Sequence, residues 1–241
     1  MKIPNIKEYN GLPVVTSEKM KYIDRLATLD YSISSQTLME NAGKACANEV
    51  ANYVKEKFNN FEINISVLCG RGHNGGDGLV CARYLKDLGF NNVKIFIINP
   101  SDRGYPELVV KNLNKAKEKS IDINLCTLRN ITEIESKLNE ADIIIDALLG
   151  ISAVGKPVAV VKKMIQIANR TKKDIIAIDI PSGLNPDTGH HTGVFIKAVL
   201  TLTMGLPKSG LMAACAQKNI GILKVIDIGY PQALIERIKK N

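Results

Sequence analysis

Polar side chains that carry oxygen follow three apolar stretches of the sequence, in a pattern that could build one site. They are Asn74, Asp77, Asp146, Asp179 and Ser182. In a doubly wound sheet the loops after the carboxyl ends of the strands form the ligand crevice, so we expect these groups to converge. Each aspartate could instead only cap the turn after its strand. Two aspartates at matching strand ends, beside a glycine-rich run, favour a functional site.

Three of these groups could hold a cation. The amide of Asn74, the carboxylate of Asp146 and the hydroxyl or carbonyl of Ser182 all offer hard oxygen ligands. Such ligands suit an alkali or alkaline-earth ion and do not suit zinc. One negative charge among neutral oxygens favours a monovalent ion.

Asp179 stands at the end of an apolar stretch and is followed by Ile180 and Pro181. Partial burial there is expected to raise the pKa of its carboxyl toward the range of a general acid or base, unless a hydrogen-bond donor or a cation opposes this. We therefore predict that Asp179 transfers protons.

The glycine-rich run admits two interpretations. Gly70, Gly72 and Gly75 have the spacing G-x-G-x-x-G, which is typical of a dinucleotide site with its pyrophosphate at a helix N-terminus. The next apolar run, however, ends in Asn99 and Pro100, with no acidic residue to hold a ribose 2′-hydroxyl. Asp77 inside the run would also repel a phosphate, and its other interpretation is a helix N-cap.

Composition indicates an ordinary globular chain. It has 241 residues, of which 45% are hydrophobic and 23% charged, and no apolar stretch reaches the roughly 20 residues of a membrane span. Residues 1–13 contain no apolar signal core, so we expect a cytoplasmic protein, although a mitochondrial one stays possible. The five scattered cysteines form no C-x-x-C pair and are expected to be reduced core residues.

The net charge of +8 could indicate a nucleic-acid partner or a phosphate-bearing ligand. The lysines are spread along the chain, aromatic residues make up only 5%, and no recognition helix or RNA-binding motif is present. We interpret the charge mainly as solvated surface, so a nucleic-acid partner is not expected.

Alternating apolar strands and helical patterns predict a Rossmann-like three-layer α/β/α sandwich with a mainly parallel central sheet and an N-terminal helical extension. Ser17 is expected to cap the first helix, and Thr37 and Glu40, near the start of the second helix at about Ser35, fit a capping box. The expected strands are 63–68, 93–98, 123–128, 141–146, 175–179, 198–204 and 223–228. The expected helices are 17–29, 35–58, 79–88, one that begins at 106, 131–139 and 157–170, followed by a short helix before the last strand and a basic helix at the end of the chain.

Five ordered motifs together resemble the NAD(P)H-hydrate epimerase family, the YjeF N-terminal domain, from about Ser17 to Pro231. They are LMENAG at 38–43, GHNGGDGLV at 72–80, DALLG at 146–150, AIDIPSGLN at 177–185 and GLPKSGL at 205–211. The resemblance implies an isomerase of nicotinamide cofactor repair that interconverts the R and S epimers of hydrated NADH and NADPH, written NAD(P)HX. The family has a Rossmann-like fold and is commonly dimeric, so a homodimer is expected.

The resemblance also implies the residues of the site. A potassium ion would be held by Asn74, Asp146 and Ser182, and Asp179 would be the catalytic residue. The implied substrate contacts are His73, Asn74, Gly75, Gly76, Asp77, Gly150, Ile151, Ser152, Ala153, Val154, Gly155, Lys156 and Asp179. Many members have asparagine where this chain has His73, which leaves the contact of that residue open.

We expect residues 1–241 to form one YjeF N-terminal-type domain, with an extension at 1–15. Some members carry a second, kinase-like dehydratase domain, for which this chain has no room, so a separate NAD(P)HX dehydratase is the expected functional partner. Two other functions remain open. One is a non-catalytic nucleotide-binding or scaffold module on the same fold. The other is a nicotinamide-dependent oxidoreductase, against which the missing ribose-binding acid counts.

Overall fold

Seven parallel strands form the centre of the computed structural model, which describes residues 3–100, 102–153, 155–191 and 193–240. Their order across the sheet is β5-β4-β3-β6-β7-β8-β9. The strands are β3 (Ile65–Cys69), β4 (Val93–Ile98), β5 (Asp122–Cys126), β6 (Ile143–Ala147), β7 (Asp174–Ile178), β8 (Leu200–Met204) and β9 (Ile222–Ile226). The predicted parallel sheet is confirmed.

The strand order changes direction at β3, because β4 and β5 are added on one side of this strand and β6 to β9 on the other. This strand pairs with β4 on one side, where Ile65 lies opposite Val93, and with β6 on the other, where Ile65 lies opposite Ile143. Such a switch point opens a crevice at the carboxyl ends of the strands, where loops diverge to opposite faces. The ends of β3, β6 and β7 are therefore neighbours, as the sequence predicts for their polar residues.

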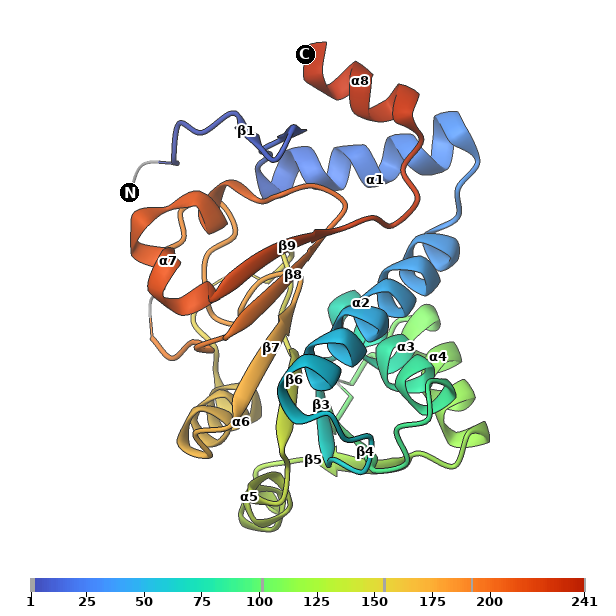
Figure 1. The fold of residues 1–241 in the computed structure, drawn as a ribbon, viewed down its shortest axis with the longest axis vertical. Coiled ribbons are helices and arrows are strands. Elements are labelled where there is room, and N and C mark those ends of the chain that lie inside the picture. The colour runs from blue at the N-terminus through green and yellow to red at the C-terminus, as the bar shows by residue number, and fades with distance from the viewer. Residues whose placement is uncertain (1–2, 101, 154, 192, 241) are drawn as a thin grey trace.

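Helices cover both faces of the sheet, which makes three layers (Figure 1). One face carries α2 (Ser35–Phe58), α3 (His73–Asp87) and α4 (Glu107–Glu118), and the other carries α5 (Ile131–Asn139) and α6 (Ala159–Arg170). The remaining elements lie toward the β9 edge. They are the hairpin β1 (Glu8–Tyr9) and β2 (Leu12–Pro13), α1 (Ser17–Tyr31), the 3-10 helix η1 (Ser209–Met212), α7 (Ala214–Ile220) and α8 (Gln232–Lys240).

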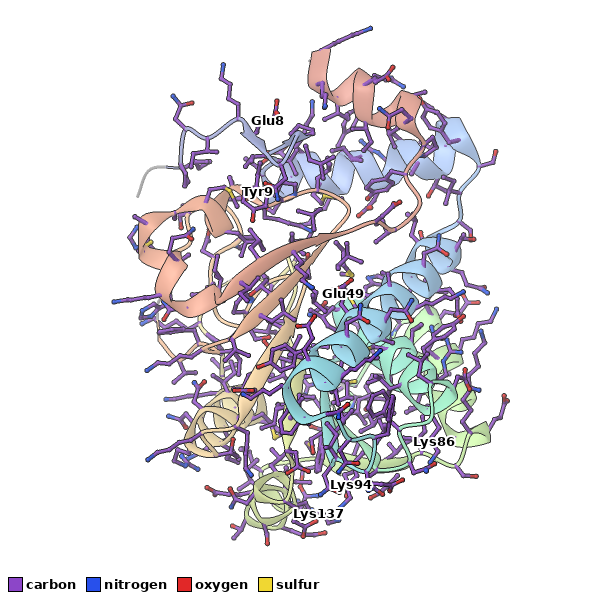
Figure 2. All side chains as sticks on the ribbon, in the orientation of Figure 1. Glu8, Tyr9, Glu49, Lys86, Lys94 and Lys137 are labelled. Atoms are coloured by element: carbon purple, nitrogen blue, oxygen red, sulfur yellow. The ribbon has the colours of Figure 1, made fainter. Side chains whose placement is uncertain are left out.

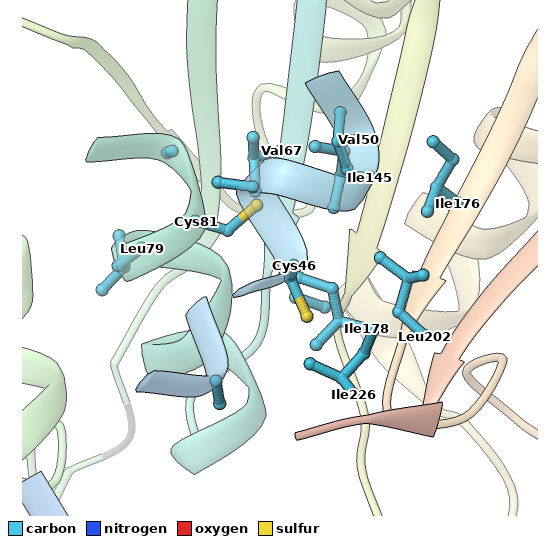
Figure 3. Packing of buried hydrophobic residues seen from close by; sticks show 14 of the residues in the cluster. Cys46, Val50, Val67, Leu79, Cys81, Ile145, Ile176, Ile178, Leu202 and Ile226 are labelled. Carbon is cyan, nitrogen blue, oxygen red and sulfur yellow. The ribbon is translucent and has the colours of Figure 1, made fainter. Parts of the chain in front are cut away.

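The main core lies between the sheet and α2. Figure 3 shows Cys46 and Val50 of this helix directed at strand residues that include Val67, Ile145 and Ile178. All five of these side chains are fully buried. Four of the five cysteines are buried free thiols and Cys215 is partly buried, as expected for core cysteines.

Helices α1 and α2 begin at Ser17 and Ser35, as predicted, but their two predicted caps and one other helix start are wrong. The N-cap of α1 is Thr16, whereas Ser17 bonds to Asp187 at 2.5 and 2.9 Å. The N-cap of α2 is Ser34, whose hydroxyl accepts from the amide of Thr37, so no capping box forms with Glu40. In both helices a hydroxyl residue that comes earlier in the sequence accepts a hydrogen bond from a free amide of the first turn. The residue that was predicted to do so is therefore free to contact a partner elsewhere in the chain.

The third error concerns the glycine-rich run, which is not a loop before a helix that begins at residue 79. Helix α3 already begins at His73, with Gly72 as its N-cap. Asp77 is thus the fifth residue of the helix and not its cap. Glycine disfavours helices by about 1 kcal/mol, so its density conceals a helix that tertiary packing stabilises.

Lysines at the amino edge of the sheet explain part of the positive charge. Figure 2 shows Lys86, Lys94 and Lys137 at the end of the molecule where β4 and α5 lie. Lys94 pairs with Glu140 at 3.0 Å, and Lys137 pairs with Glu133 at 2.8 Å. These pairs support the interpretation of a solvated surface. No helix in the described part of the chain is long and apolar enough to cross a membrane.

Candidate functional site

The first turn of α3 is built for close approach at the switch point. A Cβ on Gly70 would overlap the carbonyl of Leu148, and one on Gly75 would overlap the carbonyl of Gly70, so both positions require glycine. A Cβ on Gly72 would meet nothing within 4 Å. These are the three roles of a dinucleotide fingerprint: a tight turn, an open approach to the backbone amides, and close packing of helix on strand.

Asn74 connects this helix to the neighbouring strand ends. Its Nδ2 donates to the carbonyls of Leu149 at 3.0 Å and Ile178 at 3.3 Å. Its Oδ1 is buried and has no hydrogen-bond partner among the described residues. A buried acceptor without a partner costs free energy, so this oxygen is suited to a ligand.

Asp146 and Ser182 are fully buried and contact each other directly. The carboxylate of Asp146 accepts from the amide of Ser182 at 2.8 Å, from its hydroxyl at 2.7 Å, and from the amide of Leu148 at 3.2 Å. Burial raises the pKa of Asp146 to about 6, although these hydrogen bonds favour its charged form.

The carbonyl of Leu149 connects both groups. It accepts from Asn74, and Ser182 Oγ lies 3.4 Å from it. The sequence prediction that Asn74, Asp146 and Ser182 converge is therefore confirmed. The donor set consists of neutral oxygens and one carboxylate, which suits a monovalent alkali ion. No group of three or more His, Cys, Asp or Glu side chains that could hold a metal occurs in the described chain, so nothing there resembles a zinc site.

Asp179 follows β7 and forms a buried ion pair. Its Oδ1 lies 2.7 Å from the Nζ of Lys208, and the two side chains are 5% and 1% exposed. Its Oδ2 accepts from the amide of Ile151 at 3.2 Å. The lysine supplies the counter-charge for this buried carboxylate.

The backbone of Asp179 is in the left-handed region, with φ of 70°. Its amide donates to the carbonyl of Leu202 at 2.8 Å, which holds the residue against β8. A non-glycine residue in this conformation is strained and persists only where the surroundings enforce it, and such residues cluster at active sites.

The N-terminal segment holds Lys208 in place. Val15 lies beside it in a parallel bridge, with hydrogen bonds to Pro207 and Ser209 at 2.9 and 2.8 Å. The ammonium of Lys208 also donates to the carbonyl of Met204 at 2.7 Å. The extension before the first helix is therefore part of the site's support.

Two further carboxylates act electrostatically on this pair. Burial, together with the charges of Asp179 and Asp24, raises the pKa of Asp77 well above its usual value. Asp77 is buried within α3, whereas Gly72 and His73 at the start of the helix are exposed. Burial also raises the pKa of Asp24, which accepts a hydrogen bond from the hydroxyl of Tyr230.

The loop after β6 closes over the strand ends. Ile151 bonds to Asp179, and a Cβ on Gly150 would lie 3.0 Å from both Asn74 Cβ and Asp179 Oδ2. Ser152, Ala153, Gly155 and Lys156 are exposed, and Val154 lies outside the described residues.

The remaining predicted residues divide into exposed and inward-facing groups. His73 is exposed at the start of α3. Gly76 is buried, and a Cβ there would lie 2.7 Å from Met39 Cε. The α-carbons of Gly75 and Gly76 thus face the protein, so only their backbones could reach a ligand.

Sequence reasoning missed Lys208, Asp24 and Tyr230 as members of the site. Lys208 was present in the motif at 205–211, but nothing local distinguishes a buried lysine from an exposed one. Asp24 and Tyr230 lie 206 positions apart in the chain, so no spacing could have paired them.

Comparisons with known proteins agree with this geometry. A family model described as YjeF-related protein N-terminus matches residues 35–210. A protein of Elusimicrobium minutum named NAD(P)H-hydrate epimerase is 38% identical over 94% of this chain and all of its own length. One of Pirellula staleyi with the same name is 32% identical over 91% of this chain and 94% of its own.

Other relatives are longer. The bifunctional NAD(P)H-hydrate repair enzyme Nnr of Moorella thermoacetica is 36% identical over 92% of this chain, which spans 41% of that protein. The crystal structure of yeast ynu0 superposes with a TM-score of 0.82, at 24% identity, over 94% of this chain and 93% of the yeast chain. That likeness supports the α/β/α fold.

Proposed function

Because the chain belongs to the family of YjeF-related N-terminal domains, we propose that it is an NAD(P)H-hydrate epimerase, which interconverts the R and S epimers of NAD(P)HX. The observation that carries the proposal is the strained, buried Asp179 paired with Lys208, at the strand ends beside the glycine-rich start of α3. Relatives named for this activity, at 32% and 38% identity over nearly the whole chain, support it.

Asp179 would transfer the proton that epimerisation requires. Inversion of the carbinol centre, by ring opening or by loss and re-addition of water, needs a group that removes a proton and returns one. The ammonium of Lys208 balances the negative charge of the buried Asp179 carboxylate. The amide of Ile151 donates to the second carboxylate oxygen and orients it. The pair is thus preorganised before substrate binds.

The substrate would lie across the carboxyl ends of β3, β6 and β7. His73, Asn74, Asp77 and the backbones of Gly75 and Gly76 would contact it from α3. The described residues of the 150–156 loop would cover it, with Asp179 at its reactive ring. The strand order and the open approach at Gly72 support this placement.

A potassium ion would be held by Asn74, Asp146 and Ser182. The unpartnered Oδ1 of Asn74 and the shared carbonyl of Leu149 support this. When bound, the ion would satisfy these oxygens, fix three loops relative to one another and offset substrate phosphate charge.

We also propose two partners. A homodimer would cover the exposed apolar side chains of α1, where Leu29 is 71% and Tyr22 is 39% exposed. A separate dehydratase would consume the S epimer. The relatives named as bifunctional repair enzymes, of which this chain spans about two fifths, support a functional link to a second repair step.

The experiment is to supply R-NADHX to the purified protein and follow the S form by chromatography, with potassium present and then replaced by sodium. We expect conversion well above the spontaneous rate, reduced in sodium. Conversion at the spontaneous rate, despite binding of the hydrate, would instead identify a binding or scaffold module.

A further inference from the structure

A second feature is a pocket of about 270 Å³. The loop after β6 and the start of α6 supply most of its lining, and Arg71 and Ile98 add the ends of β3 and β4. Ile98, Leu149, Pro157 and Val158 contribute apolar walls. The charged side chains among its described lining residues are Arg71 and Lys156, both basic and both exposed. Apolar walls with two cations suit a flat ring that carries an anionic group.

Arg71 is held at the end of β4 by its neighbour across the sheet. Its Nε donates to the carbonyl of Asn99 at 2.6 Å, and its Nη2 lies 3.3 Å from Asn99 Oδ1. These bonds orient the planar guanidinium and leave donors for a ligand. Among the described residues no carboxylate forms an ion pair with Arg71, so its charge is available to an external anion.

The end of β4 is the position that distinguishes the two cofactors in doubly wound dinucleotide-binding folds. An acidic residue there holds the ribose 2′-hydroxyl of the unphosphorylated form, whereas a nearby arginine accommodates a 2′-phosphate. Here β4 is the strand beside β3 on the side away from β6, and the residue after it is the neutral Asn99, on which Arg71 is docked.

We propose that this pocket binds the adenosine end of the hydrate, that Arg71 contacts its 2′-phosphate, and that NADPHX is therefore the preferred substrate. The inference rests on the proposed function for the identity of the substrate. The strand order is consistent with this placement, because the adenosine end of the substrate would lie at β3 and β4 and its hydrated ring would lie at β7, on the other side of β6. Lys156 adds a second positive charge to the same pocket.

The competing explanation is that Arg71 only braces the end of β4. Tyr105 already fixes that end, because its hydroxyl donates to the carbonyl of Ile98 at 2.7 Å. If bracing were the only role, loss of the guanidinium would change the two substrates equally, since they share every atom except the 2′-phosphate.

The experiment measures kcat/KM for NADPHX and NADHX in the wild type and in Arg71→Gln. We expect the wild type to prefer NADPHX and the ratio of the two values to fall about tenfold to a hundredfold in the variant, the usual worth of a charge-assisted phosphate contact. Arg129→Gln is the matched control, because Arg129 is an exposed arginine that follows β5, outside the pocket. Its ratio should equal that of the wild type.

An unchanged ratio in Arg71→Gln, or an equal loss for both substrates, would overturn the inference. A binding measurement separates this from failure of the proposed function. In calorimetry the wild type should bind 2′,5′-ADP more tightly than 5′-AMP, which lacks only the 2′-phosphate, and Arg71→Gln should lose that difference, whether or not the hydrates are epimerised. Equal affinity of the wild type for both nucleotides would contradict the subsite, whereas epimerisation failure alone would contradict only the function.

Discussion

Two ion pairs of the molecule differ in how the chain holds them. Glu40 of α2 and Arg83 of α3 join two packed helices, with Nη2 of Arg83 3.0 and 2.8 Å from the carboxylate oxygens and 3.0 Å from Asn112. Asp179 and Lys208 join two loops after strands, and Asp179 has the left-handed backbone. The first pair is partly exposed, with Glu40 at 28%, whereas the second is buried and has the strained backbone.

An ion pair that is removed from solvent is therefore not by itself a sign of a catalytic role. Glu40 lies on regular helix backbone, and its pair fastens α2 to α3, so its role is structural. Asp179 lies at the carboxyl edge of the sheet near Asn74, whose buried Oδ1 has no hydrogen-bond partner among the described residues. Strain together with unsatisfied neighbours distinguishes the reactive pair from the structural one.

The largest effect is expected from Lys208→Met. Removing the ammonium leaves Asp179 buried without a counter-charge, which should lower the free energy of unfolding by about 3–5 kcal/mol. Epimerisation should fall to the spontaneous rate. Chemical denaturation and the chromatographic assay measure the two effects.

The double variant Asp179→Asn with Lys208→Met is the control, because it removes both charges of this pair and leaves neither partner uncompensated. We expect it to regain part of the lost stability without regaining activity. A double variant as active as the wild type would show that this pair is only structural.

Glu40→Gln should affect stability and spare the chemistry. Arg83 would lose its charged partner, so we expect a loss of about 1–3 kcal/mol in the free energy of unfolding and near-normal kcat. A large loss of kcat with unchanged stability would reverse the roles assigned to the two pairs.

The effect of Glu40→Gln should also depend on pH. Burial opposes it, but hydrogen bonding and the charges of Arg83 and Lys115 together lower the pKa of Glu40. The stabilisation is therefore present above the unfolded-state pKa of glutamate and is lost as pH falls through the lower folded-state pKa. Melting curves of variant and wild type should converge at acid pH, and a constant difference would contradict the assignment.

The smallest effect is expected from Gly150→Ala. The new methyl would lie 3.0 Å from Asn74 Cβ and from Asp179 Oδ2, so both must shift by a few tenths of an ångström. Misplacement of reacting groups lowers rates steeply, and we expect kcat/KM to fall about tenfold. Gly193→Ala is the control, since its methyl would meet nothing within 4 Å. Equal activity of both variants would show that the Asp179 carboxylate tolerates displacement.

Much of the fold could be predicted because its signals are local. Apolar runs gave the strands, and the end of each run located Asp146 and Asp179 to the correct edge of the sheet. The helix at 131–139 was predicted with the bounds that the structure has.

The errors arise where tertiary contacts override local preference. The first turns of α3 are rich in glycine and were therefore not predicted to be helical. Glu40 bonds to Arg83, 43 positions away in the chain, and not to the start of its own helix. Lys208 could not be predicted as a site residue, because its burial depends on the N-terminal segment, in which Val15 pairs with it. Contacts between distant segments have no spacing signature in a single sequence.

The most direct test of the central claim is the epimerisation rate of Asp179→Asn. Asparagine tolerates the left-handed backbone and keeps the shape of the side chain, so the variant removes the charge and the transferable proton without disturbing the backbone. It also leaves the Lys208 ammonium buried without a counter-charge, so its free energy of unfolding is measured alongside its rate. We predict a fall of at least about a hundredfold, the usual contribution of a general acid or base, in protein that remains folded by circular dichroism. The exposed variant Asp122→Asn should keep the wild-type rate. A folded Asp179→Asn enzyme that works as fast as the wild type would contradict the account.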